Sequence, residues 1–228
     1  MLIAEDLLLL LTDDDTGRLV ASGTLTDIAL GGALLVELAL AHRVEVEGTA
    51  GRHRHDRLVV RDRTPTGDDV LDAALATVSR EEGKKPQSAL TALSKGTRAR
   101  LYERLVDAGV LRAANGRVLG VIPTHRWPSQ DVRHETDVQG ELVVSLRRGT
   151  ATDARTGALI ALLSALGAVP KVVDPVEVGV SRRELKERAA RIAEGDWAAE
   201  AVRAAISSLM AAIVAASASA AVVAGSAS

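Results

Sequence analysis

The spacing of apolar residues along the chain predicts a mainly helical protein. Between residues 25 and 41, leucine, isoleucine and alanine recur on a face wide enough for a central helix. A turn at residues 64–72 leads into a helix that ends near Ser79, with Thr and Asp side chains available to cap its first turn. Helical periodicity continues in the later segments 88–94, 98–108, 131–148, 152–165, 181–194 and 196–217.

A short hairpin and a loop interrupt this pattern. Polar and apolar residues alternate at 44–47 and 58–60, which predicts two strands joined by the polar loop 48–56. Pro170 and Pro175 mark the one substantial loop among the later helices.

A second hairpin is predicted near the middle of the chain. Val110 and Leu111 precede a turn at 114–117, and the apolar run 118–122 follows it. Asn-Gly between apolar residues favours a tight hairpin turn, so we expect the chain to reverse within 114–117.

These elements predict one domain over residues 1–217, followed by an Ala/Ser-rich tail at 218–228 that we expect to be disordered. The run 7–11 is far too short to cross a bilayer, which takes roughly 20 apolar residues. The segment 209–224 is also too short and too often interrupted by serine, so we interpret it as a buried helix and a frayed tail.

Composition sharpens the expected fold. Apolar residues make up 47% of the 228 residues and aromatic residues 1%, so a core of Leu, Val, Ile and Ala is expected. The chain has no Cys, which excludes disulfides and thiolate metal sites and favours a cytoplasmic location. The N-terminus lacks the basic region of a signal peptide. Arginine far outnumbers lysine, a bias typical of GC-rich bacterial genomes.

The charge pattern limits the classes of function. A net charge of −2 argues against a whole-protein footprint for nucleic acid or membrane, so any anion site must be local. No phosphate loop, nucleophile elbow or zinc-protease motif occurs, and we therefore predict no enzymatic activity and no cofactor. The three acids 13–15 are interpreted as a solvated turn. His53 and His55 have the spacing of a metal pair without a third ligand nearby, so no metal site is predicted.

Five segments, in order, resemble the Golgi phosphoprotein 3 family over nearly the whole chain. They are residues 7–11, 29–40, 65–68 with 71–75, 104–111 and 155–163. The resemblance implies a single helical domain with a central hydrophobic bundle, amphipathic outer helices and a protruding β-hairpin. It also implies recruitment to membranes that carry phosphatidylinositol 4-phosphate, as in the eukaryotic members.

The same resemblance implies a lipid headgroup site at Lys95 and Arg98. These two basic residues stand at i and i+3 near a helix start, where free N–H groups reinforce phosphate binding. We expect both side chains to be exposed. Ser22 and Gly31 occupy positions where the family places a Trp and an Arg ligand, so the prediction is affinity for anionic headgroups in general.

The second hairpin is the expected membrane contact. By the resemblance, Val118, Leu119, Val121 and Ile122 replace bulkier membrane-dipping residues, so insertion should be shallow. Trp127 has two interpretations: an anchor at the headgroup level beside the hairpin, or a cover over an edge of the core. The expected protein is cytoplasmic and peripherally associated with an anionic phospholipid surface.

Two other functions compete with lipid binding. One is a winged-helix-like nucleic-acid-binding protein, in which residues 98–108 and the hairpin are recognition helix and wing. Its phosphate contacts would be Arg98, Arg100, Arg104, Arg112 and Arg117, but Glu103 and Asp107 interrupt the positive face, and nucleic acid is not the expected partner. The other is an adaptor that gathers membrane enzymes through their cytoplasmic tails, as the resemblance implies for eukaryotic members.

Overall fold

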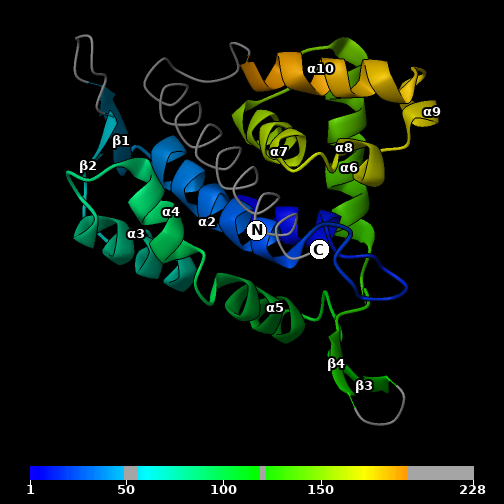
Figure 1. The fold of residues 1–228 in the computed structure, drawn as a ribbon, viewed down its shortest axis with the longest axis horizontal. Coiled ribbons are helices and arrows are strands. Elements are labelled where there is room, and N and C mark those ends of the chain that lie inside the picture. The colour runs from blue at the N-terminus through cyan, green and yellow to red at the C-terminus, as the bar shows by residue number, and fades with distance from the viewer. Residues whose placement is uncertain (49–55, 119–121, 195–228) are drawn as a thin grey trace, which may run out of the picture.

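A computed structural model describes residues 1–48, 56–118 and 122–194 of the chain, and within them it confirms the mainly helical fold (Figure 1). The helices of the first half are α1 (Ile3–Leu10), α2 (Gly23–Leu40), α3 (Asp69–Arg80), α4 (Pro86–Leu93) and α5 (Thr97–Asp107). Those of the second half are α6 (Arg133–Arg148), α7 (Ala154–Ala165), α8 (Val169–Val172), α9 (Pro175–Val178) and α10 (Arg182–Glu194). The strands are β1 (Val44–Gly48), β2 (Asp56–Val60), β3 (Ala114–Val118) and β4 (Ile122–Arg126).

Helix α2 is the centre of the protein. Helices α3, α4 and α5 pack along one side of it, while α7 packs on the other side and carries α10 (Figure 1). Among the described helices, α2 has the length and hydropathy of a membrane span, but most of it is buried inside the fold. Its apolar surface is therefore used to build the core.

Helix α1 is an addition to the predicted elements. Every residue from Ile3 to Leu10 is buried, so the segment shows no amphipathic period from which a helix could be recognised. Its two acids are buried as well and need partners. Glu5 Oε1 lies 2.9 Å from Arg104 Nε, and Asp6 lies 2.6 Å from Arg155 Nη2 and 2.8 Å from His134 Nε2. These contacts tie α1 to α5, α6 and α7.

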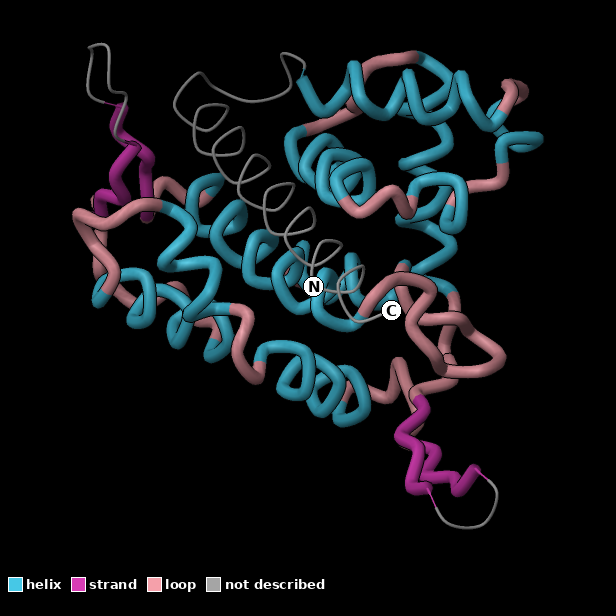
Figure 2. Tube along the Cα trace, in the orientation of Figure 1, coloured by secondary structure: helices cyan, strands magenta, loops and turns pink. Residues whose placement is uncertain are grey.

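The two hairpins stand at opposite ends of the molecule (Figure 2). Strands β1 and β2 pair as the alternation predicted, with Val46 opposite Leu58. The second hairpin is longer than predicted and turns later. Asn115 and Gly116 lie inside β3, paired with His125 and Thr124, so the turn predicted at 114–117 is wrong.

The pairing explains this shift. Leu111 bridges Ser129 in the same antiparallel register as β3 and β4, so Val110 and Leu111 pair with the segment after β4 and not with 118–122. The ladder continues to Val118, which pairs with Ile122, so the first strand runs past the predicted turn. Asn-Gly is a turn signal only where the flanking strands pair across it.

The loop predicted around two prolines contains two short helices. Pro170 and Pro175 occupy the first turns of α8 and α9, where a missing N–H costs nothing. Asp174 caps α9 by accepting a hydrogen bond from Val176 N at 2.9 Å. The helix predicted at 196–217, the tail predicted at 218–228, and His53 and His55 lie outside the described residues.

Candidate functional site

Arg98, in the first turn of α5, packs against the start of α2. Its guanidinium covers Gly23, where a Cβ atom would stand 2.8 Å from Arg98 Nη1, so a glycine at this position makes the approach possible. Arg98 Nε lies 3.1 Å from Asp27 Oδ1, one turn further along α2. The arginine side chain is 31% exposed and thus half-buried, so the expectation of an exposed Arg98 is wrong. Arg98 is half-buried because it packs on Gly23 of α2 and pairs with Asp27.

Arg98 only partly stabilises the charged form of Asp27. Burial raises the pKa of Asp27, and the attraction of Arg98 offsets this only in part. The attraction of Arg98 therefore stabilises the Asp27 carboxylate by less than the loss of hydration destabilises it. A phosphate group carries more charge and more acceptor oxygens, so it can compete with Asp27 for the guanidinium.

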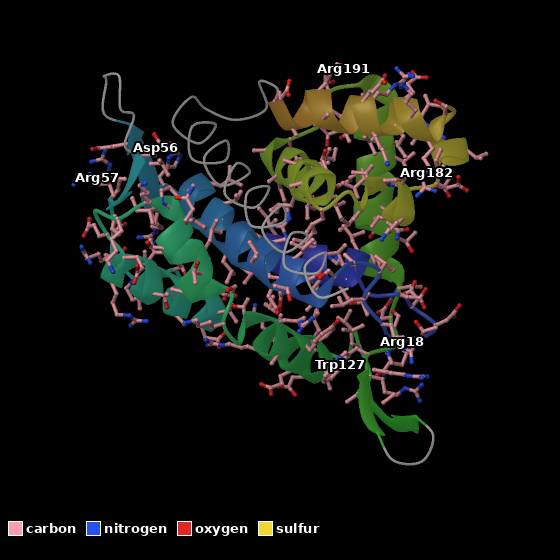
Figure 3. The ribbon with its side chains drawn as sticks, viewed as in Figure 1. Arg18, Asp56, Arg57, Trp127, Arg182 and Arg191 are labelled. Carbon is pink, nitrogen blue, oxygen red and sulfur yellow. The ribbon has the colours of Figure 1, made fainter. Side chains whose placement is uncertain are left out.

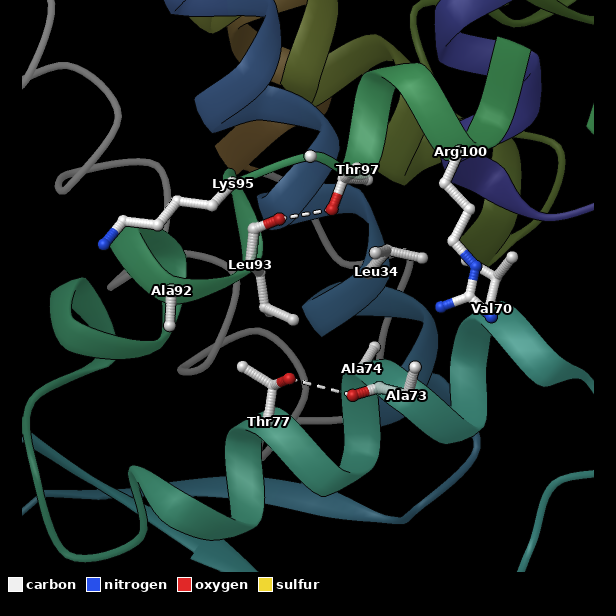
Figure 4. Close-up of a pocket in the computed structure, with 11 residues that line it drawn as sticks. Leu34, Val70, Ala73, Ala74, Thr77, Ala92, Leu93, Lys95, Thr97 and Arg100 are labelled. Carbon is white, nitrogen blue, oxygen red and sulfur yellow. Dashed lines mark hydrogen bonds between the residues drawn. The ribbon is translucent and has the colours of Figure 1, made fainter. Parts of the chain in front are cut away.

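Lys95 is exposed in the turn between α4 and α5, just before Gly96, whose φ of +75° needs a glycine. Within the described part of the chain it makes no ion pair. It stands on the rim of a cavity of about 210 Å³ between α2, α3, α4 and α5, opposite Arg100 (Figure 4). Lys95 and Arg98 share the start of α5, but no interaction joins them, and an anion would have to bridge the two.

The two departures from the family pattern have different structural settings. Ser22 is the residue before α2 and forms no side-chain cap on the helix. At Gly31, a Cβ atom would stand 3.1 Å from Ser94 N and 3.2 Å from Leu90 O. Because the end of α4 packs directly on this glycine, an arginine ligand has no room at this position.

Trp127 stands at the base of the second hairpin. Its ring stacks on Tyr102 of α5, with centroids 4.6 Å apart and an interplanar angle of 9°. The backbone N–H of Trp127 donates to Gly17 O at 3.1 Å, and a Cβ atom on Gly17 would stand 2.2 Å from that backbone nitrogen. The half-buried ring thus covers a core edge, as one of the two interpretations predicted, and an anchor at the headgroup level stays a prediction.

Tyr102 links the hairpin base to Arg98. Its hydroxyl lies 3.0 Å from Thr12 Oγ1, while burial raises the tyrosine pKa and the charge of Arg98 opposes that rise. Arg98 and Trp127 therefore meet on the same side of α5 through Tyr102. Of the predicted membrane contacts, Val118 and Ile122 are paired in register at the end of the ladder, and Leu119 and Val121 lie outside the described residues.

Sequence reasoning named Arg112 as a possible phosphate contact, but it missed Arg18 and the grouping of arginines near Trp127. Arg18 and Arg112 are exposed, Arg126 is half-buried, and none of the three forms an ion pair with any residue that the structure describes. We call these three arginines and Trp127 the hairpin-foot cluster; Figure 3 labels Arg18 and Trp127 beside the hairpin. Arg18 joins it because Gly17 packs on Trp127, a contact that no local sequence pattern signals.

The arginines of α5 itself have other roles. Arg100 Nη2 lies 2.8 Å from Asp69 Oδ2, and Arg104 contacts both Glu5 and Asp68. The pKa of Asp68 is lowered, and the largest cause is the hydrogen bond that Arg104 donates to its carboxylate. With these charges satisfied inside the fold, the winged-helix alternative loses most of its recognition helix.

The described residues form a helical body with a cationic, tryptophan-bearing base at the second hairpin. The family described as Golgi phosphoprotein 3 (GPP34) matches residues 3–209, and the chain belongs to this family. It is 34% identical over 141 residues to "Vacuolar protein sorting-associated protein 74" of Eremothecium gossypii. That match covers 54% of this chain and 43% of the relative, so the chain spans less than half of the relative's length.

Proposed function

We propose that this protein is a non-enzymatic peripheral membrane protein that docks on anionic phospholipid through the base of its second hairpin. The observation that carries the proposal is the hairpin-foot cluster: three arginines that pair with no carboxylate among the described residues, gathered from two separate chain segments around a tryptophan. Family membership supports it. Lys95 and Arg98, at the other end of α5, are the proposed headgroup ligands.

The energetics favour weak, reversible docking. A basic residue near an anionic surface contributes about 1 kcal/mol, so the three arginines supply about 3 kcal/mol and Lys95 about 1 more. Trp127 adds the preference of an indole for the headgroup level. Because most of this is electrostatic between exposed charges, binding should fall as salt is raised.

Charge reversal at the hairpin foot tests the proposal. The double variant Arg18→Glu and Arg112→Glu should bind phosphatidylglycerol vesicles at least about 30-fold more weakly, since two contributions of about 1 kcal/mol are lost and repulsion is added. Sedimentation with phosphatidylcholine vesicles, with and without phosphatidylglycerol, measures the effect. Both side chains are exposed, so the fold should be unchanged.

The matched control is Arg182→Glu with Arg191→Glu. These arginines are also exposed and unpaired among the described residues, but they stand on α10, far from the hairpin (Figure 3). Both double variants change the net charge by the same amount. Equal loss in the two would show that net charge, and not the hairpin foot, governs binding.

The finer parts of the proposal concern identity of lipid, location and partners. Gly31 leaves no room for one family ligand, which favours a general anionic headgroup over phosphatidylinositol 4-phosphate. A cytoplasmic location, a bacterial origin and an adaptor role toward the tails of membrane enzymes follow from the composition and the resemblance. Vesicles that differ only in phosphatidylinositol 4-phosphate or phosphatidylglycerol, at equal surface charge, separate specific from general recognition.

A further inference from the structure

A cavity of about 260 Å³ lies between the α1–α2 loop, α6 and α8, away from Lys95 and Arg98. Its walls carry four acids: Asp13, Asp14 and Asp15 from the loop and Glu135 from the first turn of α6. Glu135 is only 7% exposed, whereas the three aspartates reach solvent. One buried acid thus faces a cluster of acids on a surface loop.

Glu135 and Asp14 line the same cavity, and each carboxyl group influences the titration of the other. Burial and the nearby charge of Asp14 raise the pKa of Glu135 to about 7, and burial also raises the pKa of Asp14. Gln139 Nε2 donates to Glu135 Oε1 at 3.3 Å, which holds the glutamate in place on its own helix.

The same loop supports the hairpin foot. Ser129 N donates to Asp14 O at 3.2 Å, and Trp127 N donates to Gly17 O at 3.1 Å. Asp14 therefore has two roles: its side chain reaches Glu135 and its backbone holds the segment that follows β4. A displacement of the loop at Asp14 must be felt at Trp127, because Gly17 and Trp127 are in direct backbone contact.

From this arrangement we infer that the Glu135–Asp14 pair is a pH-sensitive latch on the hairpin foot. With Glu135 protonated, the buried group carries no charge, so the acidic loop can lie against α6 and the foot is fixed. When that proton passes to water, two carboxylates face each other, and Asp13 and Asp15 add to the repulsion. Asp14 stands on the solvent side, so it is the partner that moves, and the loop moves with it.

The other charged groups near Glu135 do not neutralise the pair. Lys171 of α8 lines the cavity, but its ammonium donates to Val20 O at 2.7 Å. His134, the neighbour of Glu135 on α6, lies 2.8 Å from Asp6 of α1, and Arg155 of α7 is bound to the same aspartate. Among the described residues, the cavity contains no charged side chain of α7, α9 or α10.

Fluorescence of Trp127 reports the latch directly. The reference protein carries Trp197→Phe, which leaves a single tryptophan, and His125→Gln, which removes a histidine two residues before Trp127. Its emission should change with a midpoint near neutral pH. Glu135→Gln in this background keeps a hydrogen-bond donor without a titrating proton and should abolish the change.

Asp137→Asn provides the matched control, because Asp137 is an exposed acid on the same helix and its substitution removes the same charge. This variant should keep the transition of the reference protein. A transition retained in the Glu135→Gln protein, or lost equally in the Asp137→Asn protein, would overturn the latch, as would a reference protein whose emission does not respond to pH.

The consequence for membranes rests on the proposed function. Phosphatidylglycerol keeps its charge between about pH 6 and about pH 8, so vesicle binding over that range reports the protein alone. Binding should be several-fold weaker at the higher pH in the reference protein and independent of pH in Glu135→Gln. If no variant binds vesicles at any pH, the proposed function fails, while the fluorescence transition still decides the latch.

Discussion

Two groups of arginines in this protein have opposite surroundings. Arg104 and Arg155 reach into the fold and meet Glu5 and Asp6, which are only 2% exposed. Arg18 and Arg112, at the hairpin foot, meet no carboxylate in the described part of the chain. All four residues are arginines, but only Arg104 and Arg155 have buried carboxylates as partners.

The difference separates structure from recognition. An arginine that neutralises a buried carboxylate cannot be spared without leaving that charge uncompensated. An exposed arginine without a partner contributes little to stability, and its field remains available to an anion outside the protein. Counting basic residues along the sequence cannot make this distinction, since all four carry the same charge.

The largest expected effect is at the structural arginines. Arg155→Met leaves the buried Asp6 with His134 as its remaining side-chain partner and should cost about 2 to 4 kcal/mol, less than for a fully buried pair because the arginine is 35% exposed. Urea unfolding measures the loss, and Arg191→Met, at an exposed position, should stay within about 0.5 kcal/mol of the parent. Equal stability of the two variants would contradict the structural role.

The next effect is at the hairpin foot. Arg18→Gln with Arg112→Gln removes charge without adding repulsion, so binding to anionic vesicles should weaken by about 2 kcal/mol, or about 30-fold. Unfolding free energy should change by less than about 0.5 kcal/mol. A variant that unfolds more readily but still binds would reverse the assignment of the two groups.

A smaller effect is expected from Glu135. Because its folded pKa is raised to about 7, the folded state binds the proton more tightly than the unfolded chain. The stability that this proton provides is complete below about pH 4.5 and is lost as the pH rises through about 7. Allowing for partial hydration, Glu135→Gln should remove about 1 to 2 kcal/mol of this pH dependence. Urea unfolding at about pH 5.5 and about pH 8 tests it; an unchanged slope would refute the pKa shift.

The smallest effect concerns Asp27. Asp27→Asn removes the counter-ion of Arg98 and should strengthen binding to anionic vesicles by about 0.5 to 1 kcal/mol, a few-fold change. Asp107→Asn, an exposed acid at the end of α5, serves as the control and should change binding less. Weaker binding by the Asp27→Asn protein would show that Asp27 positions Arg98 for its ligand instead of competing with that ligand.

Much of the fold could be predicted because most of the described helices have one solvent-exposed face and one buried face. Helix α2 and the amphipathic helices around it follow the spacing of their apolar residues. Helix α1 is buried on all sides and has no such period. The second hairpin was placed in the wrong register because Asn115 and Gly116 form a turn signal, while pairing with residues far beyond it decided the register.

The candidate site was predictable only where it is local. Lys95 and Arg98 stand three residues apart, and the resemblance pointed to them. The hairpin-foot cluster joins Arg18 to Arg112 and Arg126 across about 100 positions through the Gly17–Trp127 contact, which is a product of packing. Likewise, only the folded structure shows that Arg98 forms an ion pair with Asp27. It also shows that Arg100 pairs with Asp69 and Arg104 with Glu5.

The most direct measurement of the central claim is the emission of Trp127 in the Trp197→Phe protein mixed with vesicles whose acyl chains carry a quencher near the headgroup. If the hairpin foot docks on anionic lipid, emission shifts to the blue and is quenched with phosphatidylglycerol vesicles, and high salt reverses both changes. Vesicles that bind the protein while the spectrum of Trp127 stays as it is in buffer would place the docking surface elsewhere and contradict the account.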